Sequence, residues 1–117
     1  MKVLLVDDEL ELVTTLAERL EFREVEARWA TSGRDAVSLV RQEAFDVAVL
    51  DVKMPRVSGI QLKKDLERIR PEMKFVFVTG HGSEEDFRIG SAEGDRYLVK
   101  PLDIDSLVQT LREVVGS

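Results

Sequence analysis

The sequence predicts one α/β domain, built on a single parallel sheet of five strands with five helices on both of its faces. Four short apolar runs lack polar alternation, as strands do when both faces of a parallel sheet are buried. These runs cover residues 3–6, 47–50, 75–78 and 97–99. Helical patterns fill the intervals, and this alternation is typical of an open, doubly wound sheet with right-handed crossovers. No linker or repeat divides the 117 residues, so we expect one domain over residues 1–117.

The remaining strand is predicted at residues 25–30, where apolar residues alternate with Glu26 and Arg28. A strand with one polar face is suited to the edge of a sheet, because only one of its faces needs to be covered. This segment is therefore expected to lie at the edge.

Three helices are predicted between the first four strands. Apolar residues recur at helical spacing from Leu10 to Leu20, from Ala36 to Val40 after Ser32, and from Ile60 to Ile69. Pro71 ends the last of these patterns, since proline cannot continue a helix.

Two more helices are predicted in the last third of the chain. Ser83 and Asp86 resemble a capping box that opens a fourth helix. Gly90 and Gly94 weaken that helix by about 1 kcal/mol each relative to alanine. The fifth helix begins at Asp103 and carries an apolar stripe.

Composition excludes several classes of function. The net charge of −6 argues against a nucleic-acid surface, which needs clustered Lys and Arg. The chain has no cysteine, so disulfides and thiolate metal sites are excluded. The first apolar run is too short for a signal peptide or a membrane helix, so we expect a cytoplasmic protein without membrane contact.

Polar residues directly follow four of the five predicted strands. Ligands of such sheets bind beyond the carboxyl ends of the strands, so these side chains are expected to meet at one edge. They are Asp7, Asp8, Asp51, Thr79 and Lys100. Each alone has an ordinary explanation: a helix cap for the aspartate pair, a turn for Asp51 or Thr79, a solvated loop for Lys100. Their joint placement favours a functional site.

Three carboxylates in one place favour a divalent cation. Two of them 4 Å apart repel by about 1 kcal/mol in water and about 4 kcal/mol at an effective dielectric constant of 20. An all-oxygen ligand set suits Mg²⁺, with Mn²⁺ as a substitute. Zinc is disfavoured because His81 is the single histidine and no cysteine is present. A carboxylate beside Mg²⁺ can attack phosphorus, and Lys100 and Thr79 could then contact the phosphoryl oxygens.

Four segments together resemble the response-regulator receiver family of bacterial two-component systems. They are residues 6–9, residues 51–55 with the structural Gly59, the pair Thr79-Gly80, and residues 97–101. The resemblance covers essentially the whole chain. It implies a flavodoxin-like fold with strand order 2-1-3-4-5.

The resemblance also implies a role for each residue of the metal and acceptor site. Asp51 is expected to accept a phosphoryl group from a sensor histidine kinase, a phosphotransfer protein or a small donor such as acetyl phosphate. Asp8 and Asp51 are expected to ligate Mg²⁺ directly, Asp7 largely through water, and Lys53 through its backbone carbonyl.

A second set of residues is implied to carry the response. Lys100 contacts the phosphoryl group, and the peptide bond before Pro101 is typically cis. Thr79 moves toward the phosphoryl oxygen and Tyr97 turns inward. The signal then reaches an output domain or partner protein through the surface of the fourth helix, fifth strand and fifth helix. The weak fourth helix suits a segment that must rearrange.

Some positions depart from the commonest family pattern. Residues 91–95 are an unusual approach to the fifth strand, which puts the geometry of that loop in doubt. Lys53 and His81 occupy the two variable positions that tune the lifetime of the phosphorylated state in this family. Whether they neutralise charge or orient water stays open.

Rival functions fit the sequence less well. A degenerate receiver that only binds partners would lack one of the five polar positions, and none is missing. An aspartyl phosphohydrolase would place a carboxylate where this chain has Lys53. The glycines around His81 lack the lysine of a P-loop. We expect a self-modifying switch, not an enzyme with a separate substrate. The sequence leaves open which kinase acts on it, what output it controls, whether it forms a homodimer, and whether it stands alone or is part of a longer regulator.

Overall fold

Five parallel strands form the sheet of the computed structural model, which describes residues 1–80 and 96–116. The strands are β1 (Lys2–Val6), β2 (Glu26–Ala30), β3 (Val47–Asp51), β4 (Lys74–Thr79) and β5 (Arg96–Val99). Their order across the sheet is β2-β1-β3-β4-β5, and every neighbouring pair is parallel. This confirms the predicted sheet, its strand order and the edge position of β2.

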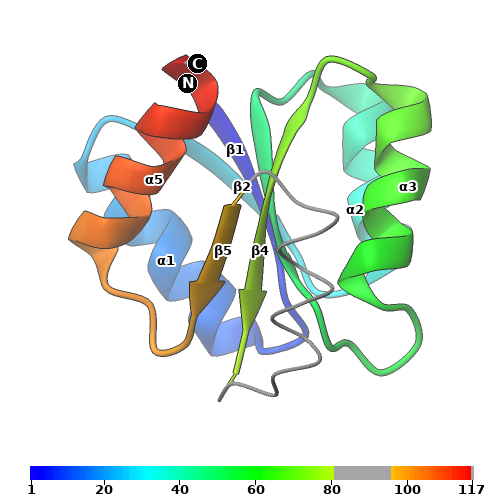
Figure 1. Ribbon diagram of the computed structural model, residues 1–117, viewed down its shortest axis with the longest axis horizontal. Coiled ribbons are helices and arrows are strands. Elements are labelled where there is room, and N and C mark those ends of the chain that lie inside the picture. Colours follow the sequence, from blue (N-terminus) through cyan, green and yellow to red (C-terminus); the bar gives the residue numbers. More distant parts are fainter. Residues whose placement is uncertain (81–95, 117) are drawn as a thin grey trace.

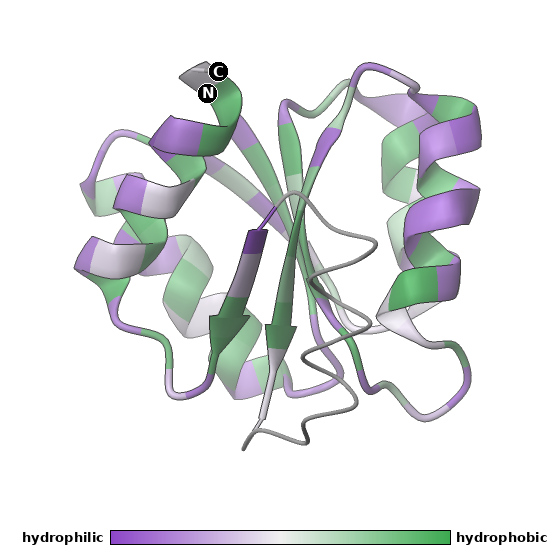
Figure 2. Ribbon diagram, viewed as in Figure 1, coloured by the Kyte–Doolittle hydropathy of each residue, from purple (hydrophilic) through white to green (hydrophobic). Residues whose placement is uncertain are grey.

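Helices cover both faces of the sheet (Figure 1). They are α1 (Leu10–Phe22), α2 (Gly33–Gln42), α3 (Gly59–Ile69) and α5 (Ile104–Gly116). α1 and α5 pack on one face over a core that includes Val3, Val49 and Leu107. α2 and α3 pack on the other face over Leu50 and Phe77. Figure 2 shows hydrophobic residues concentrated in the strands and on the helix sides turned toward them.

The three helices predicted between the first four strands are present, and serine caps fix the start of two of them. Ser32 accepts a hydrogen bond from the N–H of Asp35 (3.1 Å) at the start of α2. Ser58 accepts one from Gln61 (3.1 Å) at the start of α3. Such caps satisfy backbone donors that the first helical turn leaves unpaired. They fix the residue at which each of these two helices begins.

The two edge strands differ from the sequence expectation in how far they are covered. Residues 97–99 were expected to be buried on both faces, but Val99 is 46% exposed because β5 is the second edge of the sheet. Trp29 on β2 is 41% exposed, although Ala27 on the same strand is buried. A run of three apolar residues cannot distinguish a central strand from an edge strand, since both contain the same residue types.

The predicted fourth helix, with Ser83, Asp86, Gly90 and Gly94, lies outside the described residues. The loop of residues 91–95 lies outside them as well. In the part of the chain that is described, no helix is both long and apolar enough to cross a membrane.

Candidate functional site

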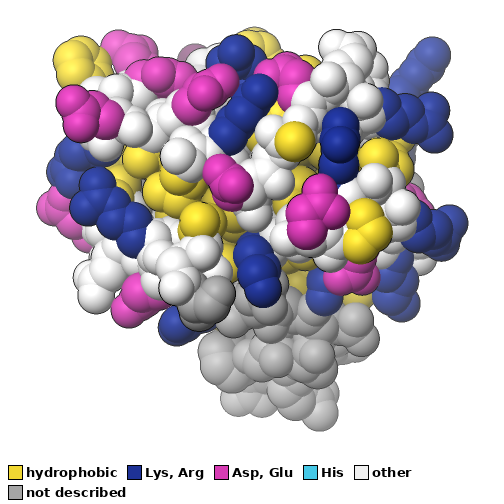
Figure 3. Space-filling view, turned by 90° about the horizontal axis from the view of Figure 1, so that it is seen from above, with side chains coloured by type: hydrophobic (Ala, Val, Ile, Leu, Met, Phe, Trp, Pro, Cys, Tyr) yellow, Lys and Arg dark blue, Asp and Glu magenta, His cyan; other side chains and the backbone are white. Residues whose placement is uncertain are grey.

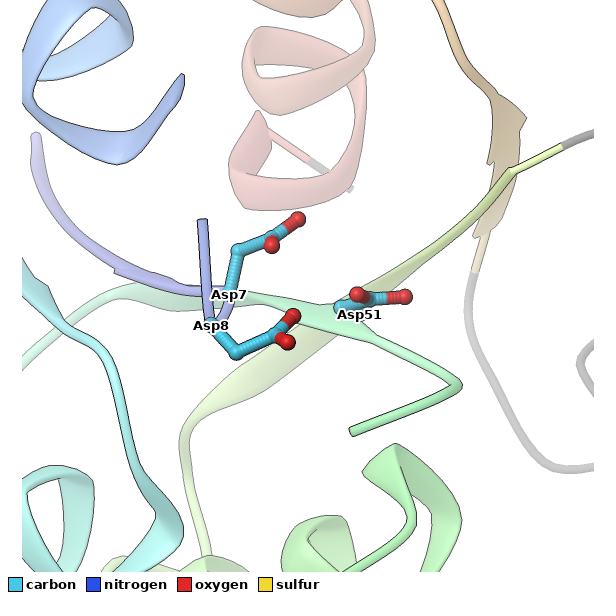
Figure 4. Close-up of side chains that lie close together, drawn as sticks. All are labelled: Asp7, Asp8 and Asp51. Carbon is cyan, nitrogen blue, oxygen red and sulfur yellow. The ribbon is translucent and has the colours of Figure 1, made fainter. Parts of the chain in front are cut away.

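Three carboxylates meet at the carboxyl ends of β1 and β3 (Figure 4). One oxygen from each of Asp7, Asp8 and Asp51 lies within 4.8 Å of the others. Asp7 and Asp51 are each only 5% exposed, whereas Asp8 is exposed. The cluster therefore has a buried base and an open mouth.

The turn after β1 positions the first two aspartates. Asp7 N–H continues the sheet by donating to the carbonyl of Ala30 (3.2 Å). The Asp7 carboxylate accepts a hydrogen bond from Glu9 N–H (2.9 Å), which tightens the turn into α1. Within the described chain, the residue at the N-cap of α1 is Glu9, and its side chain makes no capping hydrogen bond. The aspartate pair therefore does not serve as the cap of this helix.

The end of β3 is shaped by a close approach of α3. Asp51 Oδ1 accepts a hydrogen bond from Lys53 N–H (3.2 Å), and Gly59 N–H donates to the carbonyl of Val52 (2.9 Å). A Cβ atom on Gly59 would lie 2.3 Å from the Asp51 carbonyl oxygen, so a side chain there collides with backbone. Glycine at position 59 lets α3 begin directly beside Asp51.

Lys100 supplies the positive charge of the site. Its Nζ lies 2.7 Å from Asp7 Oδ2, 3.1 Å from Glu9 Oε1 and 3.6 Å from Asp51 Oδ2. Its backbone N–H donates to the Thr79 carbonyl (2.7 Å), and the Lys100–Pro101 peptide bond is cis, the isomer that the resemblance implies. One ammonium thus faces three carboxylates, two of which belong to the aspartate cluster.

The surroundings disfavour the charged form of Asp51 but favour the charged form of Lys100. Burial and the neighbouring Asp7 carboxylate raise the pKa of Asp51 to about 6, although Lys100 and the Lys53 N–H oppose this. Burial disfavours the Lys100 ammonium, but its hydrogen bonds to Asp7 and Glu9 outweigh that effect and raise its pKa. Lys100 therefore stays charged, and Asp51 is ionised at a cost.

Thr79 and Tyr97 lie on the neighbouring strands β4 and β5, where Thr79 pairs with Val99 and Tyr97 with Phe77. Thr79 is the last residue of β4 and is 1% exposed, and it follows Val78, the residue paired with Asp51 across the sheet. By strand alternation it shares the sheet face of Phe77, where half-buried Tyr97 packs against the α2–α3 core. The structure thus links Thr79 to the carboxylates through the backbone contact with Lys100.

Of the two residues predicted to tune the lifetime of the phosphorylated state, the structure describes one. Lys53 is exposed two residues after Asp51, at the rim of the site. His81 lies outside the described residues.

Sequence reasoning missed one residue of the site. Glu9 was noted only as part of a motif, yet its carboxylate contacts Lys100 directly. The available signal was its position immediately after the aspartate pair, at the carboxyl edge where Lys100 was also expected. Chemically, the assembled group can hold a divalent cation on oxygen ligands and can present an ionised carboxylate beside an ammonium group.

Comparison with known proteins agrees with this geometry. A family model described as the response regulator receiver domain matches residues 3–112. The transcriptional regulatory protein ZraR of Escherichia coli (strain K12) is 32% identical over 118 residues, covering 97% of this chain and 26% of ZraR. The chain thus spans about a quarter of the length of that relative.

Solved structures of similar proteins share the fold closely. A CheY-like response regulator receiver domain protein from Methanospirillum hungatei JF-1 has a TM-score of 0.88 and 28% identity, covering 98% of this chain and 93% of that one. A response regulator from Burkholderia pseudomallei has a TM-score of 0.86 and 27% identity, covering 98% and 68%. The latter structure contains a phosphorylated aspartic acid, a calcium ion and citrate.

Proposed function

Because this chain belongs to the response regulator receiver domain family, we propose that it is a phosphorylation-dependent signalling switch whose acceptor is Asp51. The observation that carries this proposal is the placement of Asp51. It is the one residue of the carboxylate cluster that ends a central strand, and it lies within reach of the Lys100 ammonium (3.6 Å). The phosphorylated aspartic acid of the Burkholderia pseudomallei protein supports the same chemistry.

The donor set of the site fits Mg²⁺. The three carboxylates supply oxygen ligands only, and together they carry more negative charge than the single Lys100 ammonium can neutralise. Asp8 and Asp51 would hold the ion directly, Asp7 largely through water, and Lys53 through its backbone carbonyl; Mn²⁺ would substitute. When bound, the ion neutralises phosphoryl oxygens during transfer.

Asp51 would act as a nucleophile toward phosphorus. With its pKa raised to about 6, the carboxylate is still mostly ionised at neutral pH. One carboxylate oxygen attacks phosphorus while the bond from phosphorus to the donor histidine nitrogen breaks, and the electron pair stays on that nitrogen. The product is an acyl phosphate on Asp51. Lys100 would then turn its ammonium from Asp7 and Glu9 to the new phosphoryl oxygens.

The response would pass through Thr79 and Tyr97. Thr79 is buried at the end of β4, so a hydroxyl that turns toward the phosphoryl group leaves space on the face where Tyr97 is half-buried. Movement of Tyr97 would alter the surface of β5. That surface, with α5 and the fourth helix predicted from the sequence, is the proposed contact for an output domain, a partner protein or a second copy. The chain would take a phosphoryl group from a sensor kinase or phosphotransfer protein onto its own Asp51. It would turn over no separate substrate.

Intact-mass spectrometry after incubation with acetyl phosphate and Mg²⁺ tests the proposal. We expect a gain of about 80 Da in the wild type, none in Asp51→Asn, and none in the presence of EDTA. Equal labelling of Asp51→Asn would refute the choice of acceptor. If the wild type is labelled by neither acetyl phosphate nor a phosphorylated histidine kinase, the chain is a degenerate receiver that binds partners without phosphorylation.

A further inference from the structure

A groove of about 760 Å³ runs between α2 and α3, outside the carboxylate site. Its apolar surface comes from Val37 on α2, Leu62 on α3 and Val57 in the loop between β3 and α3. This volume lies in the range of clefts that bind small ligands. It shares no lining residue with the carboxylate site.

Three arginines line this groove. Arg34 and Arg41 lie seven residues apart on α2, so they share one helix face with Val37 and are about 10 Å apart along the axis. Arg56 approaches from the loop after β3. All three are exposed, and none has an ion-pair or hydrogen-bond partner among the described residues.

The charge of this region is opposite to that of the whole chain. Residues 33–70 contain eight Lys and Arg residues against six Asp and Glu residues, whereas the full chain has a net charge of −6. Among the described residues that line the groove, Asp65 is the one acidic side chain. Figure 3 shows Lys and Arg side chains gathered along the side of the molecule on which α2 and α3 lie.

We propose that the α2–α3 groove docks an acidic, amphipathic segment of a partner protein. The apolar surface of Val37, Val57 and Leu62 would take an apolar side chain of that segment. Arg34 and Arg41 would pair with carboxylates on either side of it, because guanidinium groups bind carboxylates in a defined planar geometry. A compact anion fits less well, since it would pair with the arginines but leave the apolar surface of Val37, Val57 and Leu62 uncovered.

The groove lies outside the carboxylate site but is connected to Asp51 by one loop. Arg56 and Val57 follow Asp51 by five and six residues. A Cβ on Gly33 would lie 2.7 Å from Val57 Cγ1, so this loop packs tightly against the start of α2. A segment seated in the groove would therefore contact the loop that leaves the acceptor strand while the carboxylates remain accessible.

Peptide display on the unmodified protein tests this proposal. A phage library of random peptides is selected on the wild type and depleted on Arg34→Glu/Arg41→Glu. We expect the enriched peptides to carry Asp or Glu on both sides of an apolar residue. A fluorescein-labelled peptide from that set should bind the double variant at least about tenfold more weakly in fluorescence anisotropy, and its affinity should fall with added salt.

A matched control separates the groove from net charge. Arg19→Glu/Arg112→Glu makes the same charge change at two exposed positions on α1 and α5, and it should leave the affinity within about twofold of wild type. Far-ultraviolet circular dichroism checks that both variants are folded. Equal loss in the control, enrichment of peptides without acids, or no enrichment at all would overturn the proposal. The proposal would also be overturned if inorganic phosphate displaced the peptide fully and replacing the peptide's apolar residue did not change its affinity. That result would assign the groove to a compact anion.

Discussion

Neutralising the charge of Asp51 should make the metal-free protein more stable at neutral pH. Asp51 is 5% exposed and faces the Asp7 carboxylate, so its charged form is disfavoured in the folded chain. The substitution Asp51→Asn keeps the shape of the side chain, and its amide oxygen can still accept the hydrogen bond from Lys53 N–H, but the amide carries no charge. The variant therefore removes the repulsion and leaves the packing of β3 in place.

The size and pH window of the effect follow from the pKa of Asp51. Folding raises this pKa from 3.8 to about 6. A shift of that size corresponds to at most about 3 kcal/mol, and solvent at the open mouth of the site reduces our expectation to about 1–2 kcal/mol. Well below pH 3.8 the Asp51 carboxyl is protonated in both the folded and the unfolded state, so it costs no stability. As pH rises from 3.8 through 6 the folded state loses stability, so the advantage of the variant grows over this range and is constant above it.

Urea denaturation in EDTA between pH 4 and pH 8 measures the effect directly. The free energy of unfolding of Asp51→Asn should exceed that of the wild type by about 1–2 kcal/mol at pH 7.5, and by much less at pH 4. Glu67→Gln, which removes a carboxylate from an exposed position of α3, should show no such pH-dependent gain. Added Mg²⁺ should stabilise the wild type more than the variant and so narrow the gap. A gain that is absent at pH 7.5, or equal at both pH values, would refute the electrostatic argument.

Three further outcomes are expected. Gly59→Ala should lower the free energy of unfolding by about 2–3 kcal/mol in urea denaturation, because its Cβ would lie 2.3 Å from the Asp51 carbonyl oxygen. The control Gly116→Ala should have little effect, because its Cβ would have no neighbouring atom within 4 Å. Lys100→Gln should bind Mg²⁺ about three- to tenfold more tightly in isothermal titration calorimetry, since it removes a cation 2.7 Å from Asp7, yet it should be labelled more slowly by acetyl phosphate. Tighter Mg²⁺ binding without slower labelling would show that Lys100 opposes the cation but does not assist phosphoryl transfer. Leu66→Ala should lower the free energy of unfolding by about 2–5 kcal/mol, and a loss below about 1 kcal/mol would contradict its place in the α2–α3 core.

The fold was predictable because its signals are local. Apolar runs such as residues 47–50 mark strands without reference to neighbours, and the strand order followed from the family resemblance. The meeting of Asp7, Asp8 and Asp51 was predictable because parallel strands bring their carboxyl ends to one edge.

Other features depend on tertiary contacts that no local pattern contains. The contact between Glu9 and Lys100 joins residues 91 positions apart in the chain, so the sequence around Glu9 does not reveal it. The exposure of Val99 depends on which strand ends the sheet. Helical spacing places Arg34 and Arg41 on one face of α2, but the facing wall of the groove comes from α3 and the loop before it.

The position of Lys100 explains why the Asp51 carboxylate is ionised in this site with little compensation of its charge. Its ammonium lies closer to Asp7 (2.7 Å) than to Asp51 (3.6 Å), and Glu9 shares it at 3.1 Å. A tight pair with Asp51 would lower the pKa of that carboxyl and reduce its nucleophilicity; instead the pKa is raised to about 6. Asp51 is thus left with the least compensation of the buried charges, so it gains most when a cation binds. A cation bound at this site would therefore couple charge neutralisation to the stability of the fold at this one carboxylate.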